Sequence, residues 1–334
     1  MDVGKASRGL HGTECLQRNV LGQWCSATLV ASMRMLRPPK LITAVLLMAA
    51  RLWSANGSGT GARPQTLRVW SVRCQPSRLV NGSPILFQVT APGKIDSLSG
   101  KWFDHDVFFA LDPGSKNWIG IAGVSVETHP GKYVLVLEGK DAAGNALTFQ
   151  RSIVVGKARY RRIAVSVPKQ FTEPSPEQLQ EIKEEQTLKH DVFSRMTPQR
   201  DWAGRFTPPV EAAVSDVFGT ARVFNGQVQS IHQGLDYGVA AGTPVAAANQ
   251  GTVILARPLF FEGNCVVVDH GQGLLTIYMH LSKIEVKEGD HVTGRQEIAL
   301  SGGSGRATGP HLHIAVRWQG IYVDPATLLN LKLP

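Results

Sequence analysis

The sequence has no apolar run long enough to cross a membrane as a helix. Spanning a bilayer takes about 20 apolar residues, and the mostly apolar run 41–50 falls well short of that length. Charged residues are also few, at 18% of the chain against 43% hydrophobic residues. This balance excludes both a disordered chain and a protein embedded throughout in a membrane. The 334 residues suffice for two domains, and the 34 glycines and 19 prolines favour β-structure over helical bundles.

Evenly spread positive charge is missing as well. The formal net charge is +9, but residues 1–55 hold seven basic and two acidic residues. The rest of the chain keeps 28 basic against 24 acidic residues, so little excess charge remains there. The sequence therefore gives no reason to expect nucleic-acid binding.

The N-terminal residues 1–55 are typical of an extension followed by a secretory signal. Arg34, Arg37 and Lys40 precede the apolar run, and small residues follow it at 54–57. We expect export to the periplasm or cell envelope, with membrane contact only transient, through this segment. An uncleaved anchor or a buried strand is the alternative, and Met33 or Met35 is an alternative start.

Cysteine is scarce, with four residues in the chain. Cys15 and Cys25 fall in the segment expected to be removed, which leaves Cys74 and Cys265. Export permits a disulfide, but these two residues fall in different predicted domains. We expect two separately buried thiols.

The fold class predicted for the exported part is mostly β. Residues 56–66 predict a flexible spacer, and 67–167 predict an immunoglobulin-like β-sandwich, because short apolar runs alternate there with turns. The Asp-His-Asp sequence at 104–106 indicates a polar hairpin edge rather than a metal site. The apolar runs that predict strands of the sandwich are 85–89, 107–111 and 133–137.

A connecting helix is predicted within the linker 168–200. Ser175 is a suitable N-cap, Pro176 suits the first helical position, and Gln178 completes a capping box. Pro198 would end the helix. Residues 201–334 again alternate short apolar runs with glycine-rich turns, which predicts an antiparallel β-sheet domain. Its expected strands include 245–248, 251–256, 265–268 and 274–278.

Histidines gather in this last region. Side chains alternate along a strand, so His311, His313 and Ala315 share one half-exposed face, while Leu312, Ile314 and Val316 face the core. His232 and Asp236 lie four residues apart. These two residues with either His311 or His313 supply the three ligands of a catalytic zinc site, which leaves its fourth position open. The remaining histidines could then transfer protons.

Five short sequences in this order resemble one known family: His232–Asp236, 242–245, 269–271, Tyr278–Leu281 and Gly309–His313. Together they are similar to the LytM/lysostaphin-type zinc metalloendopeptidases, which cut bacterial cell-wall peptides. The resemblance covers about residues 214–329. It implies that His232, Asp236 and His313 bind Zn²⁺, and that His280 and His311 orient or deprotonate the water and stabilise the oxyanion. Residues 218–226 also resemble the approach to the first ligand.

The function predicted from the resemblance is exported, zinc-dependent hydrolysis of amide bonds in peptidoglycan cross-link peptides. Two alternatives stay open: a non-enzymatic wall-bound regulator that activates another hydrolase, and an exported peptidase that acts on protein. A regulatory protein partner is possible, but its identity is unknown. His270 and His291 are interpreted as structural and solvated residues, and 302–305 as a flexible loop beside the site rather than a phosphate-binding loop.

Overall fold

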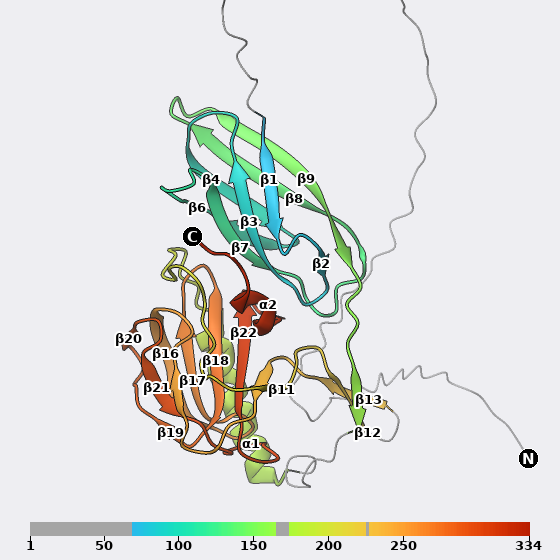
Figure 1. Ribbon diagram of the computed structural model, residues 1–334, viewed down its shortest axis with the longest axis vertical. Helices are drawn as coiled ribbons and strands as arrows, with labels where there is room; N and C mark the ends of the chain where they lie inside the picture. Colours follow the sequence, from blue (N-terminus) through green and yellow to red (C-terminus); the bar gives the residue numbers. More distant parts are fainter. Residues whose placement is uncertain (1–68, 165–173, 225–226) are drawn as a thin grey trace, which may run out of the picture. The chain divides into compact units, whose positions relative to one another are not determined.

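The computed structural model describes residues 69–164, 174–224 and 227–334 (Figure 1). The predicted signal segment, the spacer 56–66, Cys15 and Cys25 lie outside these residues. Residues 68–334 form one compact unit. No helix within the described ranges has the length and apolar character needed to cross a membrane.

The first part of the chain is a sandwich of two β-sheets (Figure 1). Apolar side chains from both sheets, among them Phe87 and Trp102, are fully buried. One sheet has the order β1 (Ser71–Gln75), β3 (Pro84–Thr90), β7 (Trp118–Gly123) and β6 (Ala110–Leu111). The other has the order β2 (Leu79–Val80), β9 (Ala146–Gly156), β8 (Gly131–Asp141), β4 (Ile95–Trp102) and β5 (His105–Phe108).

Two of the three predicted strands of the sandwich, 85–89 and 133–137, are confirmed within β3 and β8. The run 107–111 was expected to be one strand, but it is divided between β5 and β6, which belong to different sheets. The immunoglobulin-like class of the sandwich, and the predicted domain boundaries, stay predictions. The Asp-His-Asp sequence at 104–106 lies at the β4–β5 hairpin, where Asp106 pairs with Lys101.

The second part is built around an antiparallel sheet of eight strands. Its order is β11 (Val214–Asp216), β14 (Leu235–Tyr237), β22 (Leu312–Trp318), β18 (Leu274–Leu281), β17 (Gly263–Asp269), β16 (Gly251–Leu259) and β20 (His291–Val292), with β23 (Ile321–Val323) also paired to β22. Two smaller sheets accompany it. They are β10 (Arg162–Ala164), β12 (Ala221–Phe224) and β13 (Gln227–Ile231), and β15 (Pro244–Ala246), β21 (Glu297–Leu300) and β19 (Lys283–Ile284).

The helix α1 (Pro176–Ser194) begins as predicted, because Ser175 and Gln178 form a capping box and Pro176 occupies the first turn. It ends at Ser194, before Pro198 is reached. A short helix, α2 (Pro325–Leu329), follows β23. The predicted strands 251–256, 265–268 and 274–278 are confirmed within β16, β17 and β18, whereas 245–248 is a strand only as far as Ala246.

One expectation about the sheet holds only in part. The face shared by His311, His313 and Ala315 was expected to be half-exposed; the two histidines are partly buried, but Ala315 is fully buried. Val192 of α1 packs there in one hydrophobic cluster with residues of four strands, so the helix covers this face of the sheet (Figure 1). The opposite face, with Leu312, Ile314 and Val316, lies in the main core as predicted.

The two cysteines of the described part are free, which agrees with the prediction of separate thiols. Cys265 is completely buried between α1 and the sheet, and burial raises the pKa of its thiol well above the usual value. Burial also raises the pKa of Cys74 to about 11. Neither thiol is therefore a ready nucleophile at neutral pH.

Candidate active site

Strand register brings the first candidate ligands together. Asp236 of β14 lies directly opposite His313 of β22, and His313 in turn lies opposite Met279 of β18. His232 follows the end of β13, where its backbone N–H donates to the carbonyl of Thr220 and its carbonyl accepts from Gly219. Antiparallel neighbours in register have side chains on the same face. The short segment between His232 and β14 therefore brings His232 close to Asp236 and His313.

The donor atoms of His232, Asp236 and His313 form a compact cluster. His232 Nε2 lies 3.1 Å from Asp236 Oδ1 and 3.1 Å from His313 Nδ1, and His313 Nδ1 lies 2.7 Å from Asp236 Oδ1. Ligands at about 2.0–2.2 Å from a tetrahedral zinc ion stand about 3.3 Å apart. Two of the three distances come close to that value and the third needs a small opening, so the cluster fits zinc.

His232 is oriented by the main chain behind it. Its Nδ1 lies 2.9 Å from the carbonyl oxygen of Val217, so the N–H at Nδ1 donates to this oxygen. The lone pair of Nε2 is then directed to the cluster. Asp216 Oδ2 lies 3.4 Å from the same Nδ1, and a carbonyl or carboxylate in this place is the usual partner of a metal-binding histidine.

The charge states of the cluster suit a divalent cation. Burial acts to raise the pKa of Asp236, but the hydrogen bonds to His232 and His313 outweigh it, and the pKa lies well below its usual range. Burial lowers the pKa of His313. An ionised carboxylate and neutral imidazoles are the protonation states that zinc binding requires. Arg222 Nη2 lies 3.9 Å from Asp236 Oδ2, on the oxygen that does not face the two histidines.

His280 lies beside this cluster, near the end of β18. Its backbone has φ 60°, a left-handed conformation that is uncommon for a residue with a side chain. Its Nδ1 lies 2.8 Å from the carbonyl oxygen of Ser304, so the N–H there donates and Nε2 keeps its lone pair. Burial, with His313 and His311 nearby, lowers the pKa of His280 to about 3. The imidazole is therefore neutral at physiological pH.

His311 completes the group. Its Nδ1 lies 2.8 Å from the carbonyl oxygen of Gly309, and its Nε2 lies 4.0 Å from Asp236 Oδ1. The rings of His280 and His311 have centroids 4.8 Å apart. The structure thus brings all five predicted site residues together, with His280 and His311 next to the three candidate ligands. Their roles stay predictions.

Gly234 allows the cluster to close. A Cβ at this position would lie 2.3 Å from His313 Nε2 and 2.6 Å from the carbonyl oxygen of Ile314. The second of these is a backbone atom of β22, an interior strand of the sheet, and cannot move aside easily. Only glycine leaves the room that His313 occupies.

His270 and His291, which were interpreted as structural and solvated residues, lie elsewhere. His270 is fully buried, where its ring nitrogens bond to the carbonyl of Gln250 and the hydroxyl of Thr276, as expected for a structural residue. His291 is exposed, and its Nδ1 lies 3.6 Å from Asp201 Oδ2. That carboxylate neighbour was not anticipated.

Several groups that shape the site were missed in the sequence. The carbonyls of Val217 and Ser304 orient His232 and His280, but a backbone carbonyl has no residue-type signature. Asp216 was missed because its neighbours in space, Arg161 and Arg222, are not its neighbours in sequence. The loop 302–305 was interpreted only as flexible, although Ser304 makes three hydrogen bonds from it.

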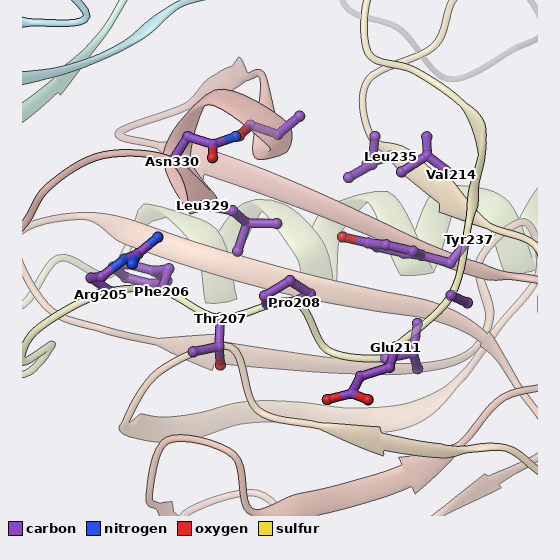
Figure 2. A pocket seen from close by; sticks show the side chains of 13 residues that line it. Arg205, Phe206, Thr207, Pro208, Glu211, Val214, Leu235, Tyr237, Leu329 and Asn330 are labelled. Carbon is purple, nitrogen blue, oxygen red and sulfur yellow. The ribbon is translucent and has the colours of Figure 1, made fainter.

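A separate cavity of about 600 Å³ lies on the other side of β14 (Figure 2). Leu235 and Tyr237 line it together with Phe206, Val214 and Leu329. Alternate residues of a strand face opposite sides, so Asp236, between two lining residues, points away from this cavity. The cavity is therefore distinct from the histidine cluster.

Two imidazoles and a carboxylate around one point, with two further imidazoles beside them, define a candidate metallohydrolase site. Residues 230–325 match Peptidase family M23, and this part of the chain is a domain of that family. All five candidate site residues lie inside the matched range.

The similar proteins agree with this assignment. Peptidoglycan DD-endopeptidase ShyA of Vibrio cholerae is 49% identical over 103 residues, which are 31% of this chain and 23% of that protein. DD-carboxypeptidase/endopeptidase Mpg of Neisseria meningitidis is 36% identical over 121 residues, 36% of this chain and 28% of that protein. The matches thus span about a quarter of the length of these relatives.

A solved structure is similar over a larger part of the chain. The crystal structure of a putative peptidase M23 from Pseudomonas aeruginosa has a TM-score of 0.58 and 29% sequence identity. The match covers 75% of this chain and 95% of that one. It therefore extends well beyond the family M23 domain.

Proposed function

We propose that the protein is an exported, zinc-dependent endopeptidase that hydrolyses amide bonds in the cross-link peptides of peptidoglycan. The observation that carries the proposal is the convergence of His232, Asp236 and His313 beside His280 and His311, inside a family M23 domain. The names of the relatives, peptidoglycan DD-endopeptidases, support a bond between D-residues as the one cut.

His232, Asp236 and His313 would hold the metal. Zinc bound there would polarise the scissile carbonyl and lower the pKa of a bound water to about 7. The protein contributes the direction of each lone pair, because His232 is fixed through Val217 and Asp236 is kept ionised by its two histidine neighbours.

His280 and His311 then handle the protons. Each donates its Nδ1 hydrogen to a backbone carbonyl, so Nε2 is the ring nitrogen left to exchange protons. A neutral imidazole can accept the proton of the attacking water there, and the resulting N–H can donate to the developing oxyanion or to the leaving amine. Because the rings are close together, one can act as the base while the other stabilises charge.

Export would bring the enzyme to its substrate in the cell envelope. The relatives named as peptidoglycan endopeptidases support this location, and so does the basic and apolar sequence at 34–55. The competing function, a wall-bound regulator without activity, has no particular observation in its favour.

The experiment is digestion of purified peptidoglycan by the zinc-loaded protein, with and without a chelator, followed by mass spectrometry. Release of cross-link peptides should stop with the chelator and in His232→Ala, and it should continue in His291→Ala, the variant at an exposed histidine. Stoichiometric zinc binding without any cleaved bond would refute the enzyme and favour the regulator.

A further inference from the structure

The helix α1 lies outside the matched residues 230–325, yet its side chains hold a loop of that domain. Both carboxylate oxygens of Glu185 accept from the backbone N–H of Phe260, at 2.8 and 3.0 Å. Lys189 Nζ lies 2.6 Å from Glu262 Oε1, and the two side chains are only 20% and 17% exposed. The helix is thus bonded to the loop 260–263 at two successive places.

Helix geometry explains why these two residues act together. Glu185 and Lys189 are four residues apart, so they lie on the same face of α1. Leu188 and Val192, on the adjoining face, pack with Leu255 and Leu259 of β16 in the cluster beneath the helix. The hydrophobic contact fixes the helix on the sheet, and the charged pair then reaches the loop at the end of β16.

The same loop holds the backbone of His280. The carbonyl oxygen of Glu262 accepts from the N–H of His280 at 2.8 Å. The left-handed backbone of His280 is unfavourable for a residue with a side chain, so it persists only where neighbouring groups impose it. Glu262 therefore connects the helix, through its carboxylate, with the active-site residue, through its carbonyl.

The second support of His280 belongs to the same unit. Ser304, whose carbonyl orients the imidazole, donates from its hydroxyl to Leu281 and accepts from the N–H of Asn264. Gly263 fits against it so closely that a Cβ there would lie 2.3 Å from Ser304 Oγ. A shift of the loop 260–263 would therefore disturb both the main chain and the ring of His280.

We propose that Glu185 and Lys189 are positioning residues for His280, and that the docking of α1 sets how well this histidine is aimed. The inference rests on the proposed function for its kinetic consequence. It goes beyond that function because it gives a helix outside the family M23 domain a part in positioning an active-site residue. Glu185 and Lys189 make their hydrogen bonds with the loop and not with the candidate ligands, so they act on the site through the loop.

The negative charges of Glu185 and Glu262 explain why Lys189 is needed to hold the loop. Glu262 Oε2 is buried with no hydrogen-bond partner among the described residues. Burial raises the pKa of Glu185, and the nearby carboxylate of Glu262 raises it further. Without Lys189, two partly buried negative charges would face each other, and the loop would move to separate and hydrate them.

The test compares Lys189→Met and Glu185→Ala with wild type in the full chain. Lys183→Met is the matched control, because Lys183 is exposed on the same helix. Glu185→Gln and Lys189→Arg keep an acceptor and a positive charge, so they should restore most of the lost property. Thermal unfolding of each variant shows whether the chain is folded, and the conservative pair keeps the test decisive if a harsher variant does not fold.

Amide hydrogen exchange at His280 and Phe260 is the first readout, and it needs neither metal nor substrate. We expect exchange to be faster by about tenfold or more in Lys189→Met and Glu185→Ala, since local opening becomes easier. In the kinetics, kcat should fall by roughly tenfold to a hundredfold, with KM and zinc stoichiometry unchanged.

The outcomes separate the two proposals. Exchange at His280 that stays at the wild-type rate in both variants would overturn the positioning role. Equal losses in Lys183→Met would also overturn it, because the effect would then follow the charge of the helix. A wild-type protein that binds zinc but cleaves nothing would refute the proposed function, while the exchange experiment would still decide the inference.

Discussion

Removal of the His280 imidazole tests the proposed division of labour in the site. In His280→Ala, the three distances among His232, Asp236 and His313 have no reason to change, because no hydrogen bond joins His280 to these donor atoms. The ring centroid of His280 lies 6.0 Å from that of His313. Zinc affinity should therefore stay close to the wild-type value.

The expected loss in rate follows from the role of the group. A positioned general acid–base contributes about 10²–10⁴-fold, which corresponds to about 3–5 kcal/mol in the activation barrier. The cost to stability is smaller. The hydrogen bond to Ser304 is lost, and one such bond contributes about 1 kcal/mol. The variant should thus remain folded with little activity.

The assay measures kcat/KM on a cross-linked peptide together with bound zinc per chain. His232→Ala is the comparison, since it should lose zinc and activity together, and His291→Ala is the control that should lose neither. Turnover in His280→Ala within about threefold of wild type would contradict a role in proton transfer, which predicts a far larger loss.

Three further changes have expected outcomes that differ in kind. Burial lowers the pKa of His270 from 6.5 to about 4, so between these pH values the unfolded chain binds a proton that the folded chain does not. The free energy of unfolding should therefore fall by on the order of 3 kcal/mol as pH decreases through this window. In urea unfolding, His270→Gln should make this dependence on pH weaker. Gly234→Ala should weaken zinc binding by about tenfold or more, measured by competition with a chromophoric chelator, since its Cβ would displace His313. Arg161→Leu should weaken zinc binding by up to about tenfold in the same assay, because Asp216, which lies behind His232, loses its closest cation. An unchanged affinity would show that Arg222 alone is enough to hold Asp216 in place.

The sequence was most informative where a contact is local. Ser175, Pro176 and Gln178 define the start of α1 through bonds within one turn, and they predicted it correctly. The alternation around His311 and His313 correctly placed Leu312, Ile314 and Val316 in the core. Both features depend on neighbours in the chain, so residue types in order are enough to predict them.

Contacts between distant segments could not be predicted in the same way. Ala315 was expected near solvent because nothing in its own strand indicates that α1 covers it, more than a hundred residues earlier in the chain. The bonds from Glu185 and Lys189 to the loop 260–263 depend on the same docking. Charged residues on a helix usually indicate an exposed face, and only the packed structure shows where these two are directed.

The most direct test of the central claim uses a single, chemically defined muropeptide dimer joined by a D,D cross-link. The full chain, saturated with one zinc ion, is incubated with the dimer, and the products are identified by mass spectrometry with and without a chelator. The account predicts two monomers, formed by addition of one water across the cross-link, and none with the chelator or in His313→Ala. An intact dimer in the presence of protein with zinc bound at His232, Asp236 and His313 would contradict it.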